Sequence, residues 1–164
     1  MAPTWTTQHP LAMASPKLQR GRNSRLGAYY AVTMALDRRA TLFADPALAR
    51  VAGAEICNSP AETCAWVVMP DHVHWLLCLR SASLSRCVQA FKSRSARAMN
   101  AARGTTGKIW QAGYYDHQLR SDEDLRQQAR YIVANPLRRG LVARIEDFPH
   151  WRCRWVSGSD DLIG

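Results

Sequence analysis

Two apolar runs separated by only two residues are the feature that most constrains the fold of this chain. Residues 64–69 read CAWVVM and residues 72–79 read HVHWLLCL, with Pro70 and Asp71 between them. Two strand-like runs joined by so short a connection are typical of a β-hairpin. We therefore expect two adjacent antiparallel strands, and any fold for the chain must contain this pair.

The segments around the hairpin predict the remaining elements. Asp45 can cap a helix that starts at Pro46, and Gly104 can end a helix whose apolar residues recur at a spacing of about 3.6. Pro136 should end a last helix near Asn135. The expected elements are strands at 29–36, 64–69, 72–79 and 114–119 and helices at 46–57, 84–103 and from 121 to 135. This order predicts the α+β class, with a ferredoxin-like, mostly antiparallel sheet and helices packed on it.

Length and charge suggest the domain organisation and a polyanionic partner. The 164 residues suit a single folded domain at 27–155, preceded by a flexible basic arm at 1–26 and followed by a tail at 156–164. The net charge is +9, and 19 of the 22 cationic residues are arginine, whose planar fork suits phosphate groups. No acidic residue occurs from His72 to Tyr115. Nucleic acid is therefore the first expected partner.

Cysteine usage and hydropathy bear on the compartment. The five cysteines are odd in number, form no CxxC motif and lie mostly in apolar surroundings, which favours reduced thiols in a cytoplasmic protein. No apolar run approaches the roughly 20 residues of a membrane helix, and the N-terminus has no apolar secretion signal. We expect neither membrane insertion nor secretion.

Two histidines of the second hairpin strand form a candidate metal site. Side chains two apart in a strand share a face, so His72 and His74 point the same way about 7 Å apart and can converge on one ion. The alternative is that both imidazoles are merely packed. A zinc or oxygen-activating site that adds Cys78 is a further alternative, but the absence of any carboxylate from residue 72 to 115 argues against it.

The last predicted helix offers a second group of polar residues. Tyr131 and Asn135 are four residues apart and so share a helical face, with Gln127 one turn earlier. A packing stripe is expected from Leu125, Ala129 and Ile132. The polar face is available to a site, although Tyr131 could instead cover the edge of the core while Asn135 caps the helix end.

These residues together resemble a known family. The motifs are His72-Val73-His74 after Met-Pro-Asp, a following basic helix, Trp110, the run YIVANP at residues 131–136, and GLV at residues 140–142. In this order they are similar to the single-tyrosine HUH transposases, and most closely to the REP-associated tyrosine transposases (RAYT). The resemblance covers roughly residues 27–155 and implies the HUH nuclease fold.

The resemblance implies an activity and roles for four residues. It implies a metal-dependent single-stranded DNA endonuclease and strand transferase that cleaves at or near REP-type hairpins through a 5′-phosphotyrosine intermediate. His72 and His74 match the metal ligands, Tyr131 matches the nucleophile, and Asn135 matches the helix position of a third ligand. The implied cofactor is Mg²⁺ or Mn²⁺, and the implied partner is single-stranded or hairpin DNA with REP-like palindromes in the bacterial nucleoid. A monomer is expected, with a dimer as the alternative.

Charge and aromatic residues extend the expected DNA contacts. We expect phosphate contacts from cations of the arm and of the long helix, and base stacking from Trp110. These cations are Lys17, Arg20, Arg22, Arg25, Arg86, Arg94 and Arg97. Asp71, Gln127 and metal-bound water remain candidates for the base that takes the tyrosine proton. The rival nucleophiles are Tyr29, Tyr30, Tyr114 and Tyr115. The alternative function is a non-catalytic DNA or RNA hairpin-binding module of the same fold.

Overall fold

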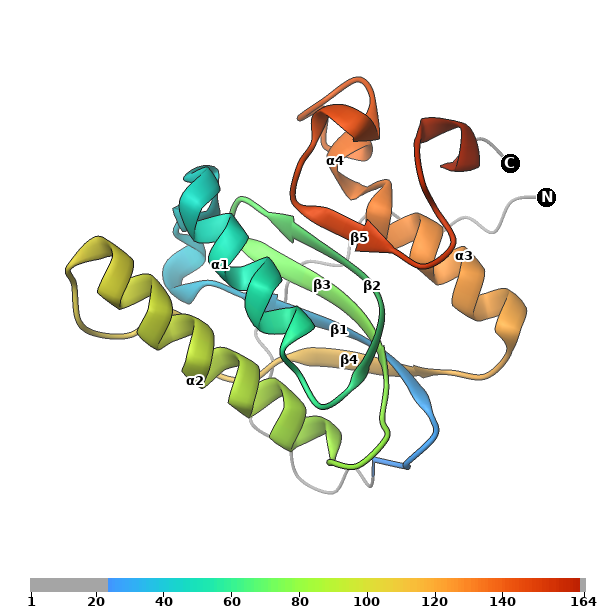
Figure 1. Ribbon diagram of the computed structural model, residues 1–164, viewed down its shortest axis with the longest axis horizontal. Helices are drawn as coiled ribbons and strands as arrows, with labels where there is room; N and C mark the ends of the chain where they lie inside the picture. Colours follow the sequence, from blue (N-terminus) through green and yellow to red (C-terminus); the bar gives the residue numbers. More distant parts are fainter. Residues whose placement is uncertain (1–23, 163–164) are drawn as a thin grey trace.

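A five-stranded sheet forms the centre of the molecule, with helices on both of its faces (Figure 1). The structure is a computed structural model that describes residues 24–162. The strands are β1 (Tyr29–Ala35), β2 (Glu62–Met69), β3 (His72–Cys78), β4 (Tyr115–Leu119) and β5 (Trp151–Cys153). The α-helices are α1 (Pro46–Cys57), α2 (Leu84–Arg103), α3 (Asp122–Val133) and α4 (Asn135–Arg138). Short 3-10 turns lie at Asp37–Arg39, Leu42–Ala44, Ile145–Asp147 and Ser159–Leu162.

The strand order confirms the predicted fold class. The strands run β4-β1-β3-β2-β5, and every neighbouring pair is antiparallel. The first four strands in this order form the ferredoxin-like arrangement that the element order predicts. The predicted hairpin is the β2–β3 pair, in which Met69 lies opposite His72. Strand β5, which sequence reasoning missed, extends the sheet at the edge of β2.

Local signals account for the helix ends. The carboxylate of Asp45 accepts a hydrogen bond from the backbone N–H of Ala47 at 2.9 Å, as an N-cap does. Ser83 caps α2 in the same way, and Gly104 ends that helix with φ of 64°, which glycine tolerates without strain. Both helices therefore have the residue ranges that the sequence predicts.

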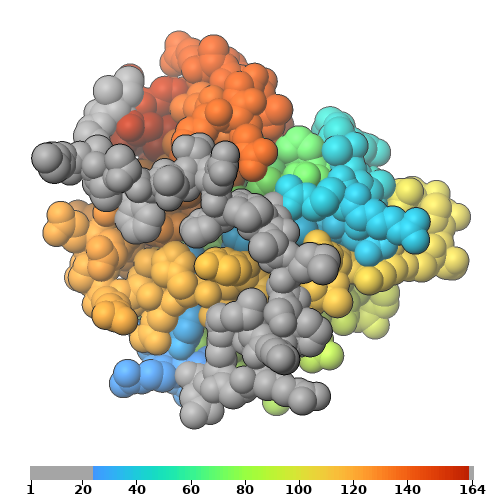
Figure 2. Space-filling view, turned by 180° about the vertical axis from the view of Figure 1, so that it is seen from behind, coloured from blue at the N-terminus to red at the C-terminus, as the bar shows by residue number. Residues whose placement is uncertain are grey.

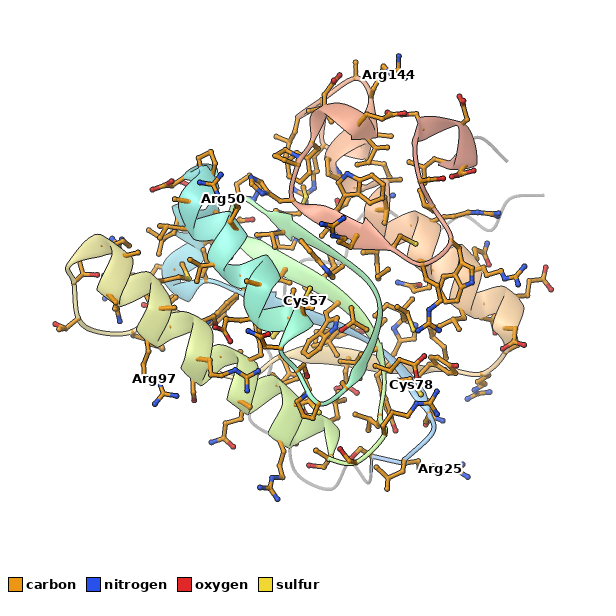
Figure 3. The ribbon with its side chains drawn as sticks, viewed as in Figure 1. Arg25, Arg50, Cys57, Cys78, Arg97 and Arg144 are labelled. Atoms are coloured by element: carbon orange, nitrogen blue, oxygen red, sulfur yellow. The ribbon has the colours of Figure 1, made fainter. Side chains whose placement is uncertain are left out.

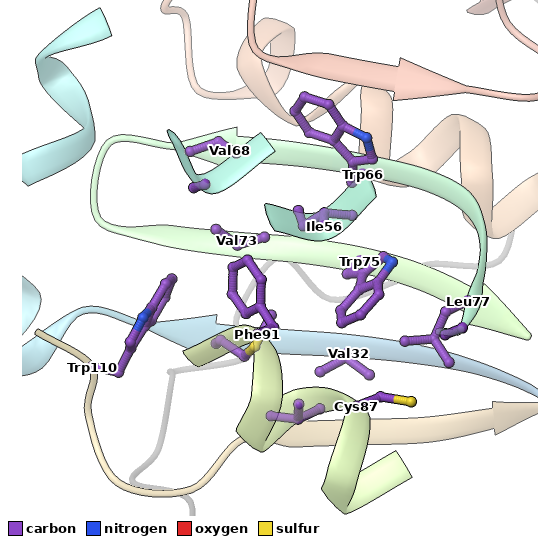
Figure 4. Close-up of a cluster of buried hydrophobic side chains, with 14 of the residues drawn as sticks. Val32, Ile56, Trp66, Val68, Val73, Trp75, Leu77, Cys87, Phe91 and Trp110 are labelled. Carbon is purple, nitrogen blue, oxygen red and sulfur yellow. The ribbon is translucent and has the colours of Figure 1, made fainter. Parts of the chain in front are cut away.

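Helices α1 and α2 cover one face of the sheet and enclose the larger core (Figure 4). Phe91 of α2 lies between two tryptophans, with ring centroids 5.8 Å from Trp75 and 5.4 Å from Trp110. The indole N–H of Trp110 donates to the hydroxyl of Ser95 at 2.9 Å, so its polar atom is satisfied inside the core. This face is a packed interior rather than a site.

Helix α3 covers the opposite face. Its buried residues Leu125, Ala129 and Ile132, the predicted stripe, pack against apolar side chains of β2 and β3 such as Val67 and Leu76. Side chains alternate between faces along a strand, so the residues of β3 that share a face with Leu76 are His72, His74 and Cys78. The histidine pair therefore lies on the α3 side of the sheet.

Residues 156–162, expected as part of a tail, contact the body of the protein. Val156 is buried beside Val133 and Ile145, and Leu162 packs against the same small cluster. The Ser159 hydroxyl donates to a carboxylate oxygen of Glu146 at 2.5 Å, and its backbone N–H donates to the other oxygen at 2.9 Å. These bonds hold the pKa of Glu146 at about 2.

Candidate active site

The β2–β3 hairpin brings two imidazoles together at the start of β3. The Nε2 atoms of His72 and His74 lie 3.1 Å apart, and the two ring planes are perpendicular. The side chain of His72 is buried, whereas that of His74 is partly exposed. Each ring therefore presents the same nitrogen to one small volume, with access from the His74 side.

Each histidine is oriented by a partner on its other ring nitrogen. Nδ1 of His72 lies 2.6 Å from Oδ1 of Asp71, and Nδ1 of His74 lies 2.9 Å from Oγ1 of Thr33 on the neighbouring strand β1. Thr33 is directly opposite His74 in the β1–β3 register. Since an ionised carboxylate only accepts hydrogen bonds, His72 carries its proton on Nδ1. This leaves its Nε2 free to act as a ligand.

Asp71 is held ionised between a histidine and an arginine. Its second oxygen, Oδ2, accepts a hydrogen bond from Nε of Arg39 at 2.9 Å and lies 2.8 Å from Nη2. Arg39 reaches it from a residue with φ of 55°, a left-handed conformation that residues other than glycine rarely adopt. The hydrogen bond from His72, together with the hydrogen bond and charge of Arg39, lowers the pKa of Asp71 to about 2.

The histidine pair fits a single divalent ion. Two nitrogen ligands of one ion, each about 2.0–2.1 Å away, stand about 2.8–3.4 Å apart for angles between octahedral and tetrahedral. The separation of 3.1 Å between the Nε2 atoms lies in this range. A metal-bound histidine usually donates its other ring N–H to a carboxylate or carbonyl, and His72 donates from Nδ1 to Asp71 in this way. Within residues 24–162 no three His, Cys, Asp or Glu side chains are grouped to hold an ion.

Replacing Asp71 by asparagine tests whether its carboxylate supports metal binding by His72. The amide keeps the shape of the carboxylate but removes the charge that fixes the proton on Nδ1 of His72. We expect Mn²⁺ affinity to fall about 10- to 100-fold, as is usual when such a partner is removed. Titration calorimetry on the whole chain measures this. Asp37→Asn is the matched control, because Asp37 pairs with Lys108 and not with a histidine. Equal affinities for the two variants would contradict the assignment.

Tyr131 lies on α3, the helix that covers the histidine side of the sheet. Its side chain is 44% exposed, while its neighbours Ala129 and Ile132 are buried against the sheet. The guanidinium of Arg138 stacks on its ring, with the carbon Cζ 3.8 Å from the ring centroid. The phenol is therefore accessible and lies on the same side of the sheet as both imidazoles. Figure 2 views this side, with α3 and α4 in orange beside β4 in gold.

Positive charge surrounds the histidine pair. Burial is the main cause that lowers the pKa of His74 well below its usual value, and the charges of His72, Arg138 and Arg139 lower it further. Arg138, the last residue of α4, and Arg139, which follows it, thus both contribute positive charge at His74. A neutral imidazole is the form that can bind a metal ion.

Asn135 does not share the environment of Tyr131, although the two residues are four apart. Helix α3 ends at Val133 with Ala134 as its C-cap, and Asn135 begins α4 before Pro136. The Asn135 side chain is 6% exposed, against 44% for Tyr131. Among the hydrogen bonds of the described chain, none joins the Asn135 side chain to either histidine. Asn135, the expected third ligand, is therefore buried at the junction between α3 and α4.

The predicted DNA-binding residues of α2 lie on the other side of the sheet from the histidines. Arg97 points to solvent from α2 (Figure 3), and Arg86 is also exposed. Arg94 instead donates from Nε to a carboxylate oxygen of Glu55 on α1 at 2.8 Å. Arg25 precedes β1 and is far along the sheet from His72, since β1 residue 29 pairs with Cys78 at the opposite end of β3. Lys17, Arg20 and Arg22 lie outside the described residues.

The predicted stacking role of Trp110 is wrong. Its side chain is only 6% exposed, and its ring packs against Phe43 and Phe91 in the α1–α2 core. A base cannot stack on a ring whose faces are covered by other side chains. The signal that misled the prediction is the position of this tryptophan after a basic helix, in a segment without periodicity.

Two rival tyrosines share the histidine face, Tyr29 opposite Cys78 at the far end of β3 and Tyr115 near His74. Tyr115 on β4 lies opposite Thr33, which in turn lies opposite His74, and the Tyr115 side chain is 45% exposed. Tyr30 is buried on the α2 side, and the hydroxyl of Tyr114 is hydrogen-bonded to Ser85 of α2 at 3.1 Å. Tyr115 is thus the rival nucleophile that any test of Tyr131 must include.

Comparisons with known proteins agree with this fold. The family model described as "Transposase IS200 like" matches residues 25–135, and the chain belongs to this family. The REP-associated tyrosine transposase of Escherichia coli (strain K12) is 32% identical over 94 residues, which cover 56% of this chain and 54% of that protein. A putative REP-associated tyrosine transposase of Haemophilus influenzae is 30% identical over 102 residues, 56% of this chain and 58% of that one. The chain spans about half the length of these curated relatives.

A solved structure supports the same relationship. The structure of a REP-associated tyrosine transposase bound to a REP hairpin matches with a TM-score of 0.65 and 28% identity, covering 80% of this chain and 79% of that chain. The resemblance to REP-associated tyrosine transposases that the sequence motifs indicate is thereby confirmed. Across residues 24–162, no helix has both the length and the apolar character needed to cross a membrane.

Proposed function

We propose that the protein is a metal-dependent single-stranded DNA endonuclease and strand transferase that acts at or near REP-type hairpins. The observation that carries this proposal is the pair of Nε2 atoms 3.1 Å apart, oriented by Asp71 and Thr33, on the same side of the sheet as the exposed Tyr131. If the two histidines were only packed against their neighbours, they would need neither the carboxylate of Asp71 nor an accessible phenol on the same side of the sheet. The family membership of residues 25–135 supports the same activity.

Each residue has a distinct role in the proposed reaction. The hydroxyl oxygen of Tyr131 attacks the scissile phosphorus, the O–P bond to the tyrosine forms, and the bond to the 3′ oxygen breaks. The phenol proton passes to solvent and the 3′ oxygen takes up a proton, so a 5′-phosphotyrosine and a free 3′-OH result. A second 3′-OH can reverse the step on another strand without ATP. When bound by His72, His74 and Asn135, Mg²⁺ or Mn²⁺ would polarise the phosphate and neutralise its charge.

Asp71 is not the base in this proposal. A carboxylate whose pKa is about 2 has little affinity for a proton at neutral pH, and both of its oxygens already accept hydrogen bonds. Its role is to orient His72. Gln127 is exposed on α3, but an amide oxygen is too weak a base to take a phenol proton. Transfer of that proton to solvent is consistent with the exposure of Tyr131.

The proposed partner is hairpin DNA with an unpaired flank, bound by a monomer in the bacterial cytoplasm, at the nucleoid. The related transposase in the solved structure is bound to a REP hairpin. A net charge of +9 and the arginines near the histidine pair suit a phosphate backbone, so affinity should fall steeply with salt. The exposed tyrosines on this side offer rings on which unpaired bases can stack.

A gel assay tests the function directly. The full chain is incubated with a labelled REP-type hairpin oligonucleotide that carries a single-stranded flank, with Mn²⁺ or with EDTA. We expect a labelled band at the mass of the protein plus the 3′ part of the oligonucleotide, resistant to denaturant, with Mn²⁺ only. Binding without this band in either condition would identify the non-catalytic hairpin-binding module instead.

A further inference from the structure

An arginine at the end of α4 stacks on the candidate nucleophile. Helix α3 ends at Val133 and α4 starts at Asn135, with only Ala134 between them. Across this junction the guanidinium carbon of Arg138 lies 3.8 Å from the Tyr131 ring centroid, and Nη1 donates to the Tyr131 carbonyl at 2.7 Å.

Arg138 is held by a different kind of contact from the five arginines of the described chain that pair with carboxylates. The arginines that contact a carboxylate are Arg39, Arg80, Arg94, Arg144 and Arg154. Within residues 24–162, Arg138 forms no ion pair and is held instead by the face and the carbonyl of Tyr131.

We propose that Arg138 is a positioning residue for Tyr131: its stacked guanidinium holds the phenol ring in a fixed orientation on the histidine side of the sheet. This inference rests on the proposed function. A tyrosine that is 44% exposed has little packing to fix its ring, so the orientation must come from its few neighbours. Two contacts from one rigid, planar group, one to the ring and one to the backbone, restrict both the ring and the helix end.

The planar shape of the arginine is essential to this role. A lysine ammonium carries the same charge, but it cannot cover a ring face and bond a carbonyl with one rigid group. Misplacement of a reacting group by about 1 Å can cost about 100-fold in rate. Loss of the stack should therefore slow the chemical step while leaving DNA affinity nearly unchanged. Loss of a charge that serves only attraction should weaken affinity and leave the chemical step nearly unchanged.

Four chains test the proposal: the unsubstituted protein, Arg138→Gln, Arg138→Lys and Arg139→Gln. Arg139→Gln removes the same charge from the adjacent residue without removing the stack. With the hairpin oligonucleotide and Mn²⁺, we expect Arg138→Gln to lower the rate of adduct formation at saturating DNA about 100-fold. Its Kd should change less than threefold, and Arg138→Lys should recover only a small part of the rate. Arg139→Gln should mainly raise Kd.

A second measurement reports on the ring without activity. Chains labelled with 3-fluorotyrosine give a ¹⁹F resonance for Tyr131, which is assigned by its loss in Tyr131→Phe. Arg138→Gln should shift and narrow this resonance, whereas Arg139→Gln should leave it in place. Full activity and an unmoved resonance in Arg138→Gln would overturn the proposal, as would full rescue by Arg138→Lys. If the unsubstituted chain forms no adduct, the proposed function fails, and the resonance alone then decides whether Arg138 fixes the ring.

Discussion

Tyr131→Phe will abolish the covalent protein–DNA adduct while leaving DNA binding intact. The substitution removes one oxygen atom, and that oxygen is the atom that would form the bond to phosphorus. The phenyl ring keeps the face on which Arg138 stacks, so the α3–α4 corner should retain its structure. We expect the adduct rate to fall by about 10⁴-fold or more, as for the loss of an enzymatic nucleophile. A denaturing gel measures the adduct and a native gel measures binding.

Tyr115→Phe is the matched control for this result. Tyr115 has nearly the same exposure as Tyr131, 45% against 44%, and lies on the same side of the sheet. It differs in its position, on β4 beyond Thr33 rather than on α3. The Tyr115 variant should keep the adduct rate within a few-fold of the unsubstituted chain. Survival of the adduct in Tyr131→Phe together with its loss in Tyr115→Phe would transfer the role to Tyr115.

Removing either imidazole of the pair will eliminate both metal binding and cleavage. In His72→Ala and His74→Ala, one Nε2 atom disappears from a pair only 3.1 Å apart, so one ion can no longer be held by both rings. A Lewis-acid ion contributes several kcal/mol to such a reaction, and we expect a loss of about 10³-fold or more in adduct rate. Titration calorimetry with Mn²⁺ and the denaturing gel give the two results.

His150→Gln controls for the loss of a buried histidine. His150 is 8% exposed, and its ring packs edge-on against Phe148. This variant should retain Mn²⁺ binding and the adduct. Addition of EDTA to the unsubstituted chain should mimic the His72 and His74 variants, and excess Mn²⁺ should reverse it. Cleavage that persists in EDTA would rule out a role for the pair as metal ligands.

Much of the fold could be predicted because short-range patterns determine it. The two-residue connection at Pro70 and Asp71 requires a hairpin, and strand alternation places His72 and His74 on one face. The spacing of Leu125, Ala129 and Ile132 predicts the buried face of α3, and Tyr131 falls outside that face. The short elements β5 and α4, of three and four residues, were missed because so few residues show no periodicity.

The candidate site was predicted only in its ligands and nucleophile, not in the groups that orient them. Thr33 contacts His74 from another strand, and Arg39 contacts Asp71 from a 3-10 turn. Nothing in their local sequence indicates those contacts. Arg138 contacts Tyr131 from the next helix, seven residues on, and no sequence pattern indicates this contact. The arginines of α2 show the converse, since a helical pattern predicts which side of a helix is exposed but not which face of the sheet the helix covers.

The central claim is that His72, His74 and Tyr131 form one metal-dependent site. Its most direct measurement is anomalous scattering from crystals of the full chain grown with Mn²⁺ and a single-stranded oligonucleotide. We predict one manganese peak within about 2.0–2.3 Å of both Nε2 atoms, with the Tyr131 hydroxyl and a phosphate of the oligonucleotide beside it. A map at saturating Mn²⁺ with no peak between the imidazoles, or with Tyr131 turned away from the bound phosphate, would contradict the account.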